Sequence, residues 1–395
     1  MSVESIRKIV TELAGIDNRG AGTPGEKQAA QMVQSEMEAL GLETSTQTFR
    51  GPKILGHAIV PMLVIALAAA SIGFLYPIPG AILIVLCLWA LAWVFNPKGV
   101  AWTRLVPCGD SFNVIGKQIT PGAKRSIVLS AHIDAGQTGL MFHPAAKRLF
   151  ARLNKNPKSV QGPMFMPVAI LGFSLFPLVV RILGGSGALL DGLHFIALGL
   201  MTVTLLITLQ YMLSPIVPGA IDNASGVAAM LEAAGALAGA PLKESNLYVA
   251  ATGSEETGMI GMKHFYRAYT DALASPPAYF INFESVGGGK LHAVEQEGEL
   301  SRVHYPPFLI GFSQFVAHKH GLGDLPTVNL LAATDSVVTA DDARQTLCLI
   351  ALDDHGVPPN YHEMADTADR VDCEVTLASA KLAVAVAREL ESQGL

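Results

Sequence analysis

Residues 246–256 read NLYVAATGSEE, an apolar stretch followed by a turn and two adjacent glutamates. Two other stretches have the same form, since RSIVLSA at 125–131 precedes His132 and AYFINF at 278–283 precedes Glu284. Short apolar runs bounded by turn residues are typical of buried strands. Ligands of parallel sheets bind beyond the carboxyl ends of the strands. The polar residues that follow these three strands are therefore expected to share one site.

The remaining soluble sequence fits an alternation of strands and helices. Further strands are predicted at 44–49 and 112–118, as an outer ribbon, and at 347–352, and helices at 25–40, 226–238, 258–269 and 373–392. This alternation predicts an α/β fold, with a mixed, largely parallel sheet and helices on both faces. Residues 286–306 contain three consecutive glycines and several charges, and they are expected to form a surface excursion beside the site.

The side chains found in five separate stretches suit a pair of metal ions. These stretches are His132-Ile133-Asp134, Asp222-Asn223-Ala224-Ser225-Gly226, Glu255-Glu256, Glu284 and His362. Zinc binds imidazole and carboxylate ligands, and a catalytic zinc keeps one position open for water or substrate. A two-metal site needs a bridging carboxylate, terminal ligands for each metal and a base for the water. The residues alone thus favour a metallohydrolase.

With these motifs the chain resembles the zinc aminopeptidases of the M28 family, the di-zinc exopeptidases. The resemblance begins at GAGTPGE (20–26), includes DNASG (222–226) and EETG (255–258), and reaches YHEMADT (361–367). It covers most of the chain apart from two hydrophobic insertions. It implies a zinc-exopeptidase-like fold, two Zn²⁺ per chain, and hydrolysis of N-terminal residues from peptide substrates.

The resemblance also implies a role for each residue. One zinc would be bound by His132, Asp222 and Glu284, and the other by Asp222, Glu256 and His362. Glu255 would be the general base that acts on metal-activated water, and Asp134 would orient the His132 imidazole or accept neighbouring polar contacts. His264 and His355 compete with His362 as ligands, but a helix face and a loop are the expected places for them.

One ligand departs from the family pattern. Glu284 stands where the family usually has Asp, and its extra methylene alters the reach of the carboxylate toward the second metal. Two alternatives to an aminopeptidase therefore stay open. One is glutaminyl cyclisation, which in that family uses one zinc, or deacylation of a small amide on the same scaffold. The other is an inactive membrane scaffold or receptor.

Two hydrophobic insertions interrupt the soluble sequence. Apolar runs at 57–76 and 79–95 form one pair, and runs at 164–183 and 192–213 form a second pair. Each run is close to the ~20 residues that a helix needs to cross a bilayer. Two transmembrane hairpins are therefore predicted, at 56–95 and 161–214, within a peptidase domain made of 1–55, 96–160 and 215–395. Buried core helices or an apolar dimerisation surface are the alternatives.

Two hairpins return the chain to its starting side, so all the candidate ligands are expected on one side of the bilayer. The enzyme-side flanks carry Arg50, Lys53, Lys98, Arg104, Lys147, Arg148, Arg152, Lys155 and Lys158. The opposite turns carry only Arg181, which predicts a multi-pass protein of the cell or inner membrane with a cytoplasmic catalytic domain. The net charge of −6 is spread along the chain, so no nucleic-acid partner is expected. The predicted partners are a peptide substrate and the lipid bilayer.

Overall fold

One mixed sheet of nine strands organises the residues that this computed structural model describes, which are 1–99, 106–147 and 164–395. The strand order is β1-β2-β4-β3-β5-β9-β6-β7, with β8 paired to β6. The strands are β1 (Glu43–Pro52), β2 (Cys108–Gln118), β3 (Arg125–His132), β4 (Ser245–Thr252), β5 (Ala278–Glu284), β6 (Lys290–Glu297), β7 (Val303–His304), β8 (Thr327–Asn329) and β9 (Gln345–Leu352). Strands β4, β3, β5 and β9 run parallel, whereas β1, β2 and β6 join in antiparallel pairings. The predicted mixed sheet with a parallel centre is confirmed.

The prediction of a surface excursion at 286–306 was wrong. Lys290–Glu297 is β6, which pairs antiparallel with β9 inside the same sheet, and Val303–His304 is β7. The three glycines form only the turn into β6, where Gly289 has a φ of +87°. The strand was missed because it carries Lys290 at one end and Glu295 and Glu297 at the other and is only partly buried, which hides its apolar residues.

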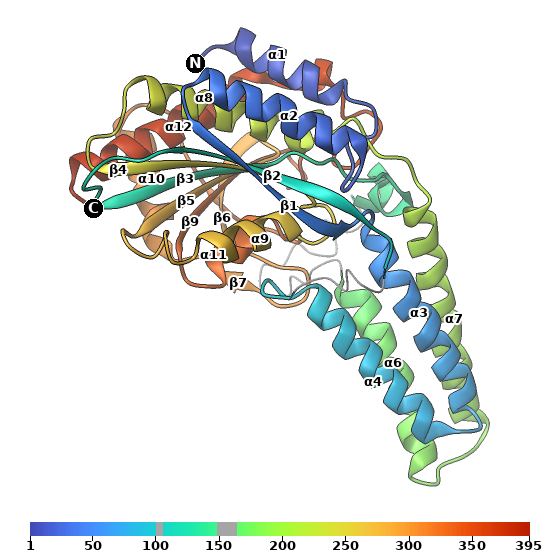
Figure 1. The fold of residues 1–395 in the computed structure, drawn as a ribbon. Coiled ribbons are helices and arrows are strands. Elements are labelled where there is room, and N and C mark those ends of the chain that lie inside the picture. The colour runs from blue at the N-terminus through green and yellow to red at the C-terminus, as the bar shows by residue number, and fades with distance from the viewer. Residues whose placement is uncertain (100–105, 148–163) are drawn as a thin grey trace.

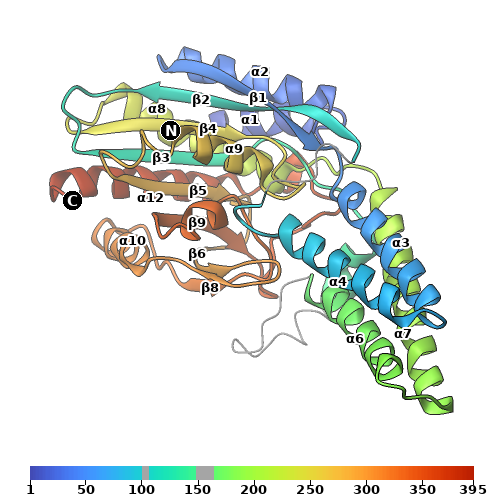
Figure 2. The same cartoon turned by 60° about the horizontal axis from the view of Figure 1, so that its bottom comes forward.

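Helices cover both faces of the sheet (Figures 1 and 2). In Figure 1, α1 (Val3–Ala14), α2 (Pro24–Ala39), α8 (Gly226–Gly239) and α12 (Cys373–Ser392) lie above the sheet, and α9 (Ile260–Tyr269) and α11 (Ser336–Ala340) lie below it. Helix α10 (Pro307–Lys319) packs beside α12. The described residues also form three short helical turns, which are η1 (Leu140–Phe142), η2 (Ala220–Ser225) and η3 (Ala368–Arg370).

A bundle of four long helices projects from the α/β domain (Figure 1). These are α3 (Leu55–Gly73), α4 (Pro77–Val94), α6 (Phe165–Ile182) and α7 (Ala188–Met212), close to the four predicted runs. Each is long and apolar enough to cross a membrane, judged by length and composition. Their outward faces expose large apolar side chains, among them Ile72, Val85, Trp89, Phe195 and Leu206. Helix α7 begins at Ala188, earlier than the predicted apolar run at 192–213. The charged Asp191 interrupts the apolar pattern but lies in the first turn of the helix, where an acidic side chain is favourable.

Both hairpins begin and end at the same end of the sheet, the carboxyl ends of the parallel strands. Strand β1 leads into α3, and α7 leads into η2, which carries Asp222. At the far end of the bundle, Arg181 Nη2 lies 2.5 Å from Asp191 Oδ1, and the Arg181 guanidinium lies 4.2 Å from the centre of the Phe74 ring. Of the basic flanking residues, Arg104, Arg148, Arg152, Lys155 and Lys158 lie outside the described part of the chain.

Candidate metal centre

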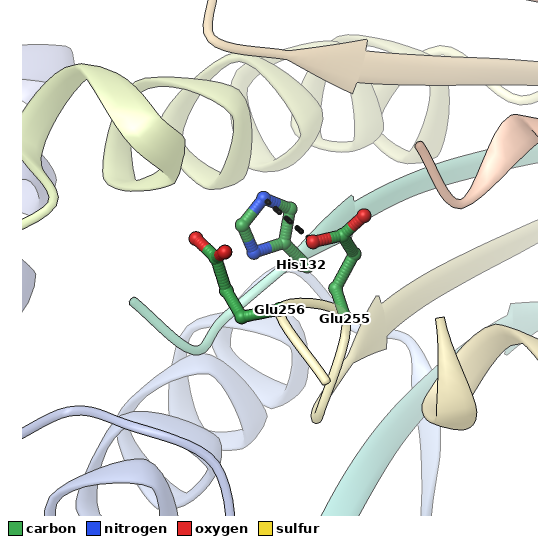
Figure 3. Close-up of side chains that lie close together, drawn as sticks. All are labelled: His132, Glu255 and Glu256. Atoms are coloured by element: carbon green, nitrogen blue, oxygen red, sulfur yellow. Dashed lines mark ion pairs between the residues drawn. The ribbon is translucent and has the colours of Figure 1, made fainter. Parts of the chain in front are cut away.

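Strand register brings three of the predicted stretches together. His132 is the last residue of β3 and is aligned with Thr252, the last residue of β4. Glu255 and Glu256 follow β4 within four residues, and Glu284 ends β5 on the other side of β3. Figure 3 shows the carboxylates of Glu255 and Glu256 on either side of the His132 ring. The expectation of one shared site at this edge of the sheet agrees with this placement.

The two other predicted ligands come from segments that do not belong to the sheet. Asp222 lies in η2, between α7 and α8, and His362 lies in the loop between β9 and α12. Both are buried. His362 has a positive φ of 53°, a conformation uncommon for a residue other than glycine, and this turns the chain sharply beside the site. Sequence spacing gave no measure of how far these two residues lie from the strand ends.

The donor atoms form two groups that share one carboxylate. His132 Nε2 lies 3.2 Å from Asp222 Oδ1 and 3.4 Å from Glu284 Oε1. His362 Nε2 lies 3.5 Å from Asp222 Oδ2 and 3.2 Å from Glu256 Oε2. Each group keeps its donor atoms within 4.8 Å of one another, as ligands of a single ion do. The two oxygens of Asp222 thus face different groups, which is the arrangement of a bridging carboxylate.

Several of these atoms are buried without a hydrogen-bond partner among the described residues. They are His132 Nε2, Asp222 Oδ1, Glu256 Oε1 and Glu284 Oε2. His132 Nε2 and Asp222 Oδ1 lie 3.2 Å apart without forming a hydrogen bond, and both residues belong to the group that contains Glu284. Buried carboxylates without a cation cost several kcal/mol each. Zn²⁺ binds imidazole and carboxylate ligands, and three of them in each group leave the fourth position of a tetrahedral site open. The residues therefore fit the metal that the sequence predicts.

The pKa values of the histidines and of Glu284 also indicate a site suited to a cation. Burial opposes the charged form of His132, but Glu284 and Glu255 outweigh it and hold the His132 pKa well above its ordinary value. For His362, burial is likewise outweighed by Glu256 and Asp222, which raises its pKa to about 10. Burial raises the pKa of Glu284, against the opposing effect of His132. The excess negative charge of this pocket is what a divalent cation neutralises.

Backbone carbonyl groups fix the tautomers of both histidines. His132 Nδ1 lies 3.1 Å from the Asp134 carbonyl oxygen, and His362 Nδ1 lies 2.9 Å from the Gln137 carbonyl oxygen. A carbonyl only accepts, so each Nδ1 must carry the proton. In the neutral imidazole that binds a metal, each Nε2 then has a lone pair that faces the carboxylate groups. Both imidazoles are therefore oriented as metal ligands.

The carboxylate of Asp134 orients the glutamates more than the imidazole. Its two oxygens accept the backbone N–H groups of Glu255 at 3.0 Å and Glu256 at 3.1 Å, while Oδ1 lies 3.6 Å from His132 Nδ1. The sequence suggested the imidazole first, because spacing two residues apart on a strand places both side chains on one face. The backbone contacts depend on the turn after β4, which no sequence pattern describes.

Three buried residues that support the site were not assigned from the sequence. Asp366 accepts the N–H groups of Ile221 at 2.7 Å and Asp222 at 3.1 Å. Arg19 donates to the carbonyl oxygens of Ile133 and Gly219, which flank two candidate ligands. Glu26 accepts from Gly22, Ser111 and Ser254. The signal was present in part, since Glu26 and Asp366 lie within the GAGTPGE and YHEMADT stretches.

Glu255 lies next to both groups, because its carboxylate forms a further cluster with His132 of one group and Glu256 of the other, with donor atoms within 4.8 Å of one another. Its Oε2 is 4.0 Å from His132 Nε2, and its side chain is about nine-tenths buried. Burial raises its pKa well above the ordinary value, with Glu284 and Glu256 adding to that effect and His132 opposing it. The competing histidines are elsewhere, because His264 stacks on Phe49 at 4.7 Å between ring centres and His355 is exposed.

Known proteins include one matching family model and several similar folds. Residues 208–387 match the model of Peptidase family M28. Three solved structures represent the similar folds. The zinc aminopeptidase BSAP from Bacillus subtilis aligns with a TM-score of 0.57 at 16% identity, over 98% of this chain and 95% of that chain. LapA aminopeptidase from Legionella pneumophila aligns with 0.55 at 14% identity, over 99% and 72%. The Bacteroides thetaiotaomicron glutaminyl cyclase bound to N-acetylhistamine aligns with 0.54 at 15% identity, over 97% of both chains.

No curated protein sequence matches the chain. The structural similarities show that the chain has the fold of zinc-dependent exopeptidases. The family match supports a peptidase-type hydrolase that uses zinc.

Proposed function

We propose that this chain is a zinc-dependent aminopeptidase that its two helical hairpins hold in a membrane. The observation that carries the proposal is the pair of donor groups that share Asp222, because a shared carboxylate between two three-residue groups suits two adjacent ions. In this proposal, His132 and Glu284 complete one zinc site, and Glu256 and His362 complete the other. The peptidase domain comprises 1–55, 96–160 and 215–395.

Bound zinc would supply Lewis acidity that polarises a scissile carbonyl and makes water acidic enough to lose a proton near neutral pH. Glu255 is the residue that takes this proton. Its carboxylate is buried beside His132 and can hold the proton until it is returned to the leaving amine. Asp134 keeps Glu255 in place through the backbone N–H. Asp134 thus acts as a positioning residue.

Cyclisation of N-terminal glutamine is the alternative that the fold also accommodates, because glutaminyl cyclases are among the similar structures. A cyclase releases ammonia and keeps every residue of the peptide, whereas an aminopeptidase releases a free amino acid. The second donor group, with Glu256 and His362, favours two ions and therefore the aminopeptidase. Mass spectrometry of a peptide that begins with glutamine separates the two products.

Membrane insertion of the hairpins is supported by helices of spanning length whose outward faces are apolar. No ionic contact would hold such helices in a bilayer, so neither high salt nor carbonate washing should release the protein. Release by salt alone would instead make the bundle a surface or dimer contact.

The activity is tested with aminoacyl fluorogenic substrates and the full chain purified in detergent. Hydrolysis should stop after treatment with a chelator and return when zinc is added. Substrates with a blocked N-terminus should not be cleaved, because an aminopeptidase needs a free amine. Turnover that persists after complete metal removal would reject the proposal.

A further inference from the structure

We propose that the site takes peptides anchored in the same bilayer, with only a few residues between their free N-terminus and the anchor. This inference names the substrate class of the proposed aminopeptidase, and it rests on that function and on insertion of the hairpins. It follows from the position of the metal centre relative to the ends of α3 and α7.

Gln137 joins the end of α7 to the metal centre. Its side-chain amide donates to the carbonyl oxygens of Met212, at 3.3 Å, and Ser214, at 2.9 Å. Its own carbonyl oxygen lies 2.9 Å from Nδ1 of His362. The segment from Gly136 to Thr138 also pairs with 215–217 through backbone hydrogen bonds. The proposed ligand His362 is therefore fixed at a short distance from the last residue of a candidate membrane helix.

Cavities at the site have walls made by the same helix ends. A cavity of about 290 Å³ is lined by Gln210 of α7, by Leu140 and Phe142 of η1, and by Glu363 and Met364 next to His362. The Phe142 ring lies 4.3 Å from the His362 ring, so this cavity adjoins the metal centre. A second, narrow cleft is lined by Leu55, Tyr211 and Glu256, and so links the first residue of α3 and the last turn of α7 to a proposed ligand.

The rim of the larger cavity is mostly apolar where it meets solvent, and His143 is the exposed polar residue in its lining. Leu140 is 62% exposed and Met364 is 52% exposed, and both line the same cavity as Gln210. A 25-residue helix such as α7 is about 37 Å long, which exceeds the ~30 Å hydrocarbon core. Its last turn, with Gln210, therefore reaches the headgroup layer. An apolar rim at that depth is suited to a peptide that lies along the bilayer surface.

The contacts of Gln137 limit how far a substrate must reach. Gln137 alone bridges the space between the end of α7 and His362. The metal centre therefore lies on the order of 10 Å from the helix end. An extended peptide covers ~3.3 Å per residue, so at least about three residues are needed to span this gap. An anchored peptide of that length is presented at a high effective concentration, whereas a shorter one cannot reach and a much longer one loses the advantage gradually.

The experiment uses the full chain in phosphatidylcholine vesicles with its catalytic domain outward. Substrates are peptides with a free N-terminal leucine, a Gly/Ser spacer of two, six or 24 residues, and a C-terminal palmitoyl-lysine, each paired with the unacylated peptide. The acylated six-residue peptide should have a kcat/KM at least about tenfold above its unacylated partner, because anchoring raises the effective concentration. The two-residue peptide should show a smaller gain, because it spans the gap only when fully extended. All three acylated peptides bind vesicles alike, so equal gains at every spacer length, or none, would overturn the inference.

Rim variants test the surface itself. Leu140→Glu or Met364→Glu should lower the ratio of acylated to unacylated kcat/KM. Ile119→Glu is the matched control, because Ile119 is 54% exposed but follows the end of β2 that lies near the start of β4, away from the metal centre. An equal loss of this ratio in Ile119→Glu would show that the effect does not depend on the rim.

A readout without turnover separates this inference from the proposed function. The same peptides carry a photo-reactive N-terminal leucine and are crosslinked to the Glu255→Gln chain in vesicles. Crosslinking that peaks at the six-residue spacer, without cleavage by the wild-type chain, would reject the aminopeptidase but keep the anchored-peptide site. Cleavage by the wild-type chain without any spacer dependence would reject the anchored substrate and keep the enzyme.

Discussion

The backbone carbonyl oxygen of Gln137 lies 2.9 Å from Nδ1 of His362, although 225 residues separate the two in the chain. The same glutamine donates its side-chain amide to the carbonyl groups that end α7. One residue thus orients a proposed zinc ligand and satisfies the end of a proposed membrane helix. Orientation of the metal centre and placement of the second hairpin are therefore physically connected.

Gln137→Leu should weaken zinc binding at the group that contains His362. Loss of the amide leaves two carbonyl groups without their donor, at a cost of about 1–3 kcal/mol, and loosens the segment that holds the imidazole. Zinc retained after dialysis against a weak chelator measures the effect. Gln314→Leu is the control, since Gln314 also donates to a carbonyl oxygen at 2.9 Å but lies on α10. Unchanged zinc retention in Gln137→Leu would contradict the connection.

The purified chain should bind about two zinc ions, because two donor groups share Asp222. Elemental analysis of His362→Ala should give about one ion per chain, and Asp222→Ala should lose both. His264→Ala should keep both, because that imidazole stacks on Phe49 outside the donor groups. One ion in the wild-type chain under excess zinc would remove the bridging role and favour cyclase-like chemistry.

Glu255→Gln should keep the metal and the fold but lose about two to four orders of magnitude in kcat, the usual contribution of a general base. The amide has nearly the same shape as the carboxylate but cannot take the proton. Glu256→Gln is the informative partner variant, since it should lower metal content as well. Near wild-type turnover in Glu255→Gln would place the base elsewhere.

Glu297 should make the metal-free chain less stable as pH rises. Its carboxyl accepts hydrogen bonds from Tyr305 and Thr334, but burial outweighs them and raises its pKa to about 8. Because the pKa is higher in the folded state than in the unfolded chain, near 4.3, its stabilising contribution is complete below about pH 4 and lost as pH rises through 8. Thermal unfolding in detergent with chelator, from pH 5 to 9, should show a falling Tm. Glu297→Gln should flatten that slope, and an unchanged slope would assign it to other groups.

The turn between α3 and α4, at 74–76, and the turn between α6 and α7, at 183–187, should face away from the cytoplasm, because the basic residues concentrate on the catalytic side. Single cysteines at Ser186 and Ser301, in a chain without its native cysteines, can be labelled on intact cells with an impermeant maleimide. Labelling is expected at Ser186 only. The reverse pattern would place the catalytic domain outside and change the source of its substrates.

Much of the fold follows from local patterns. The apolar strands before His132, Glu255 and Glu284 were predictable because burial on both faces of a central strand leaves an uninterrupted apolar run. The same reasoning failed at Lys290–Glu297, where a partly exposed strand carries charged residues. The four long helices were predictable because an apolar run of about 20 residues with almost no charge is typical of a helix of membrane-spanning length.

By itself, the sequence determined the chemical types available and their order along the chain, namely two histidines, an aspartate, the paired glutamates and Glu284. Only the tertiary structure decided which atoms meet. The 3.2 Å approach of His362 to Glu256 depends on how a loop packs across the sheet. The support from Arg19, Glu26 and Asp366 depends on hydrogen bonds to backbone groups far away in the chain. Side-chain type is local information, whereas distance between remote segments is set by packing of the whole domain.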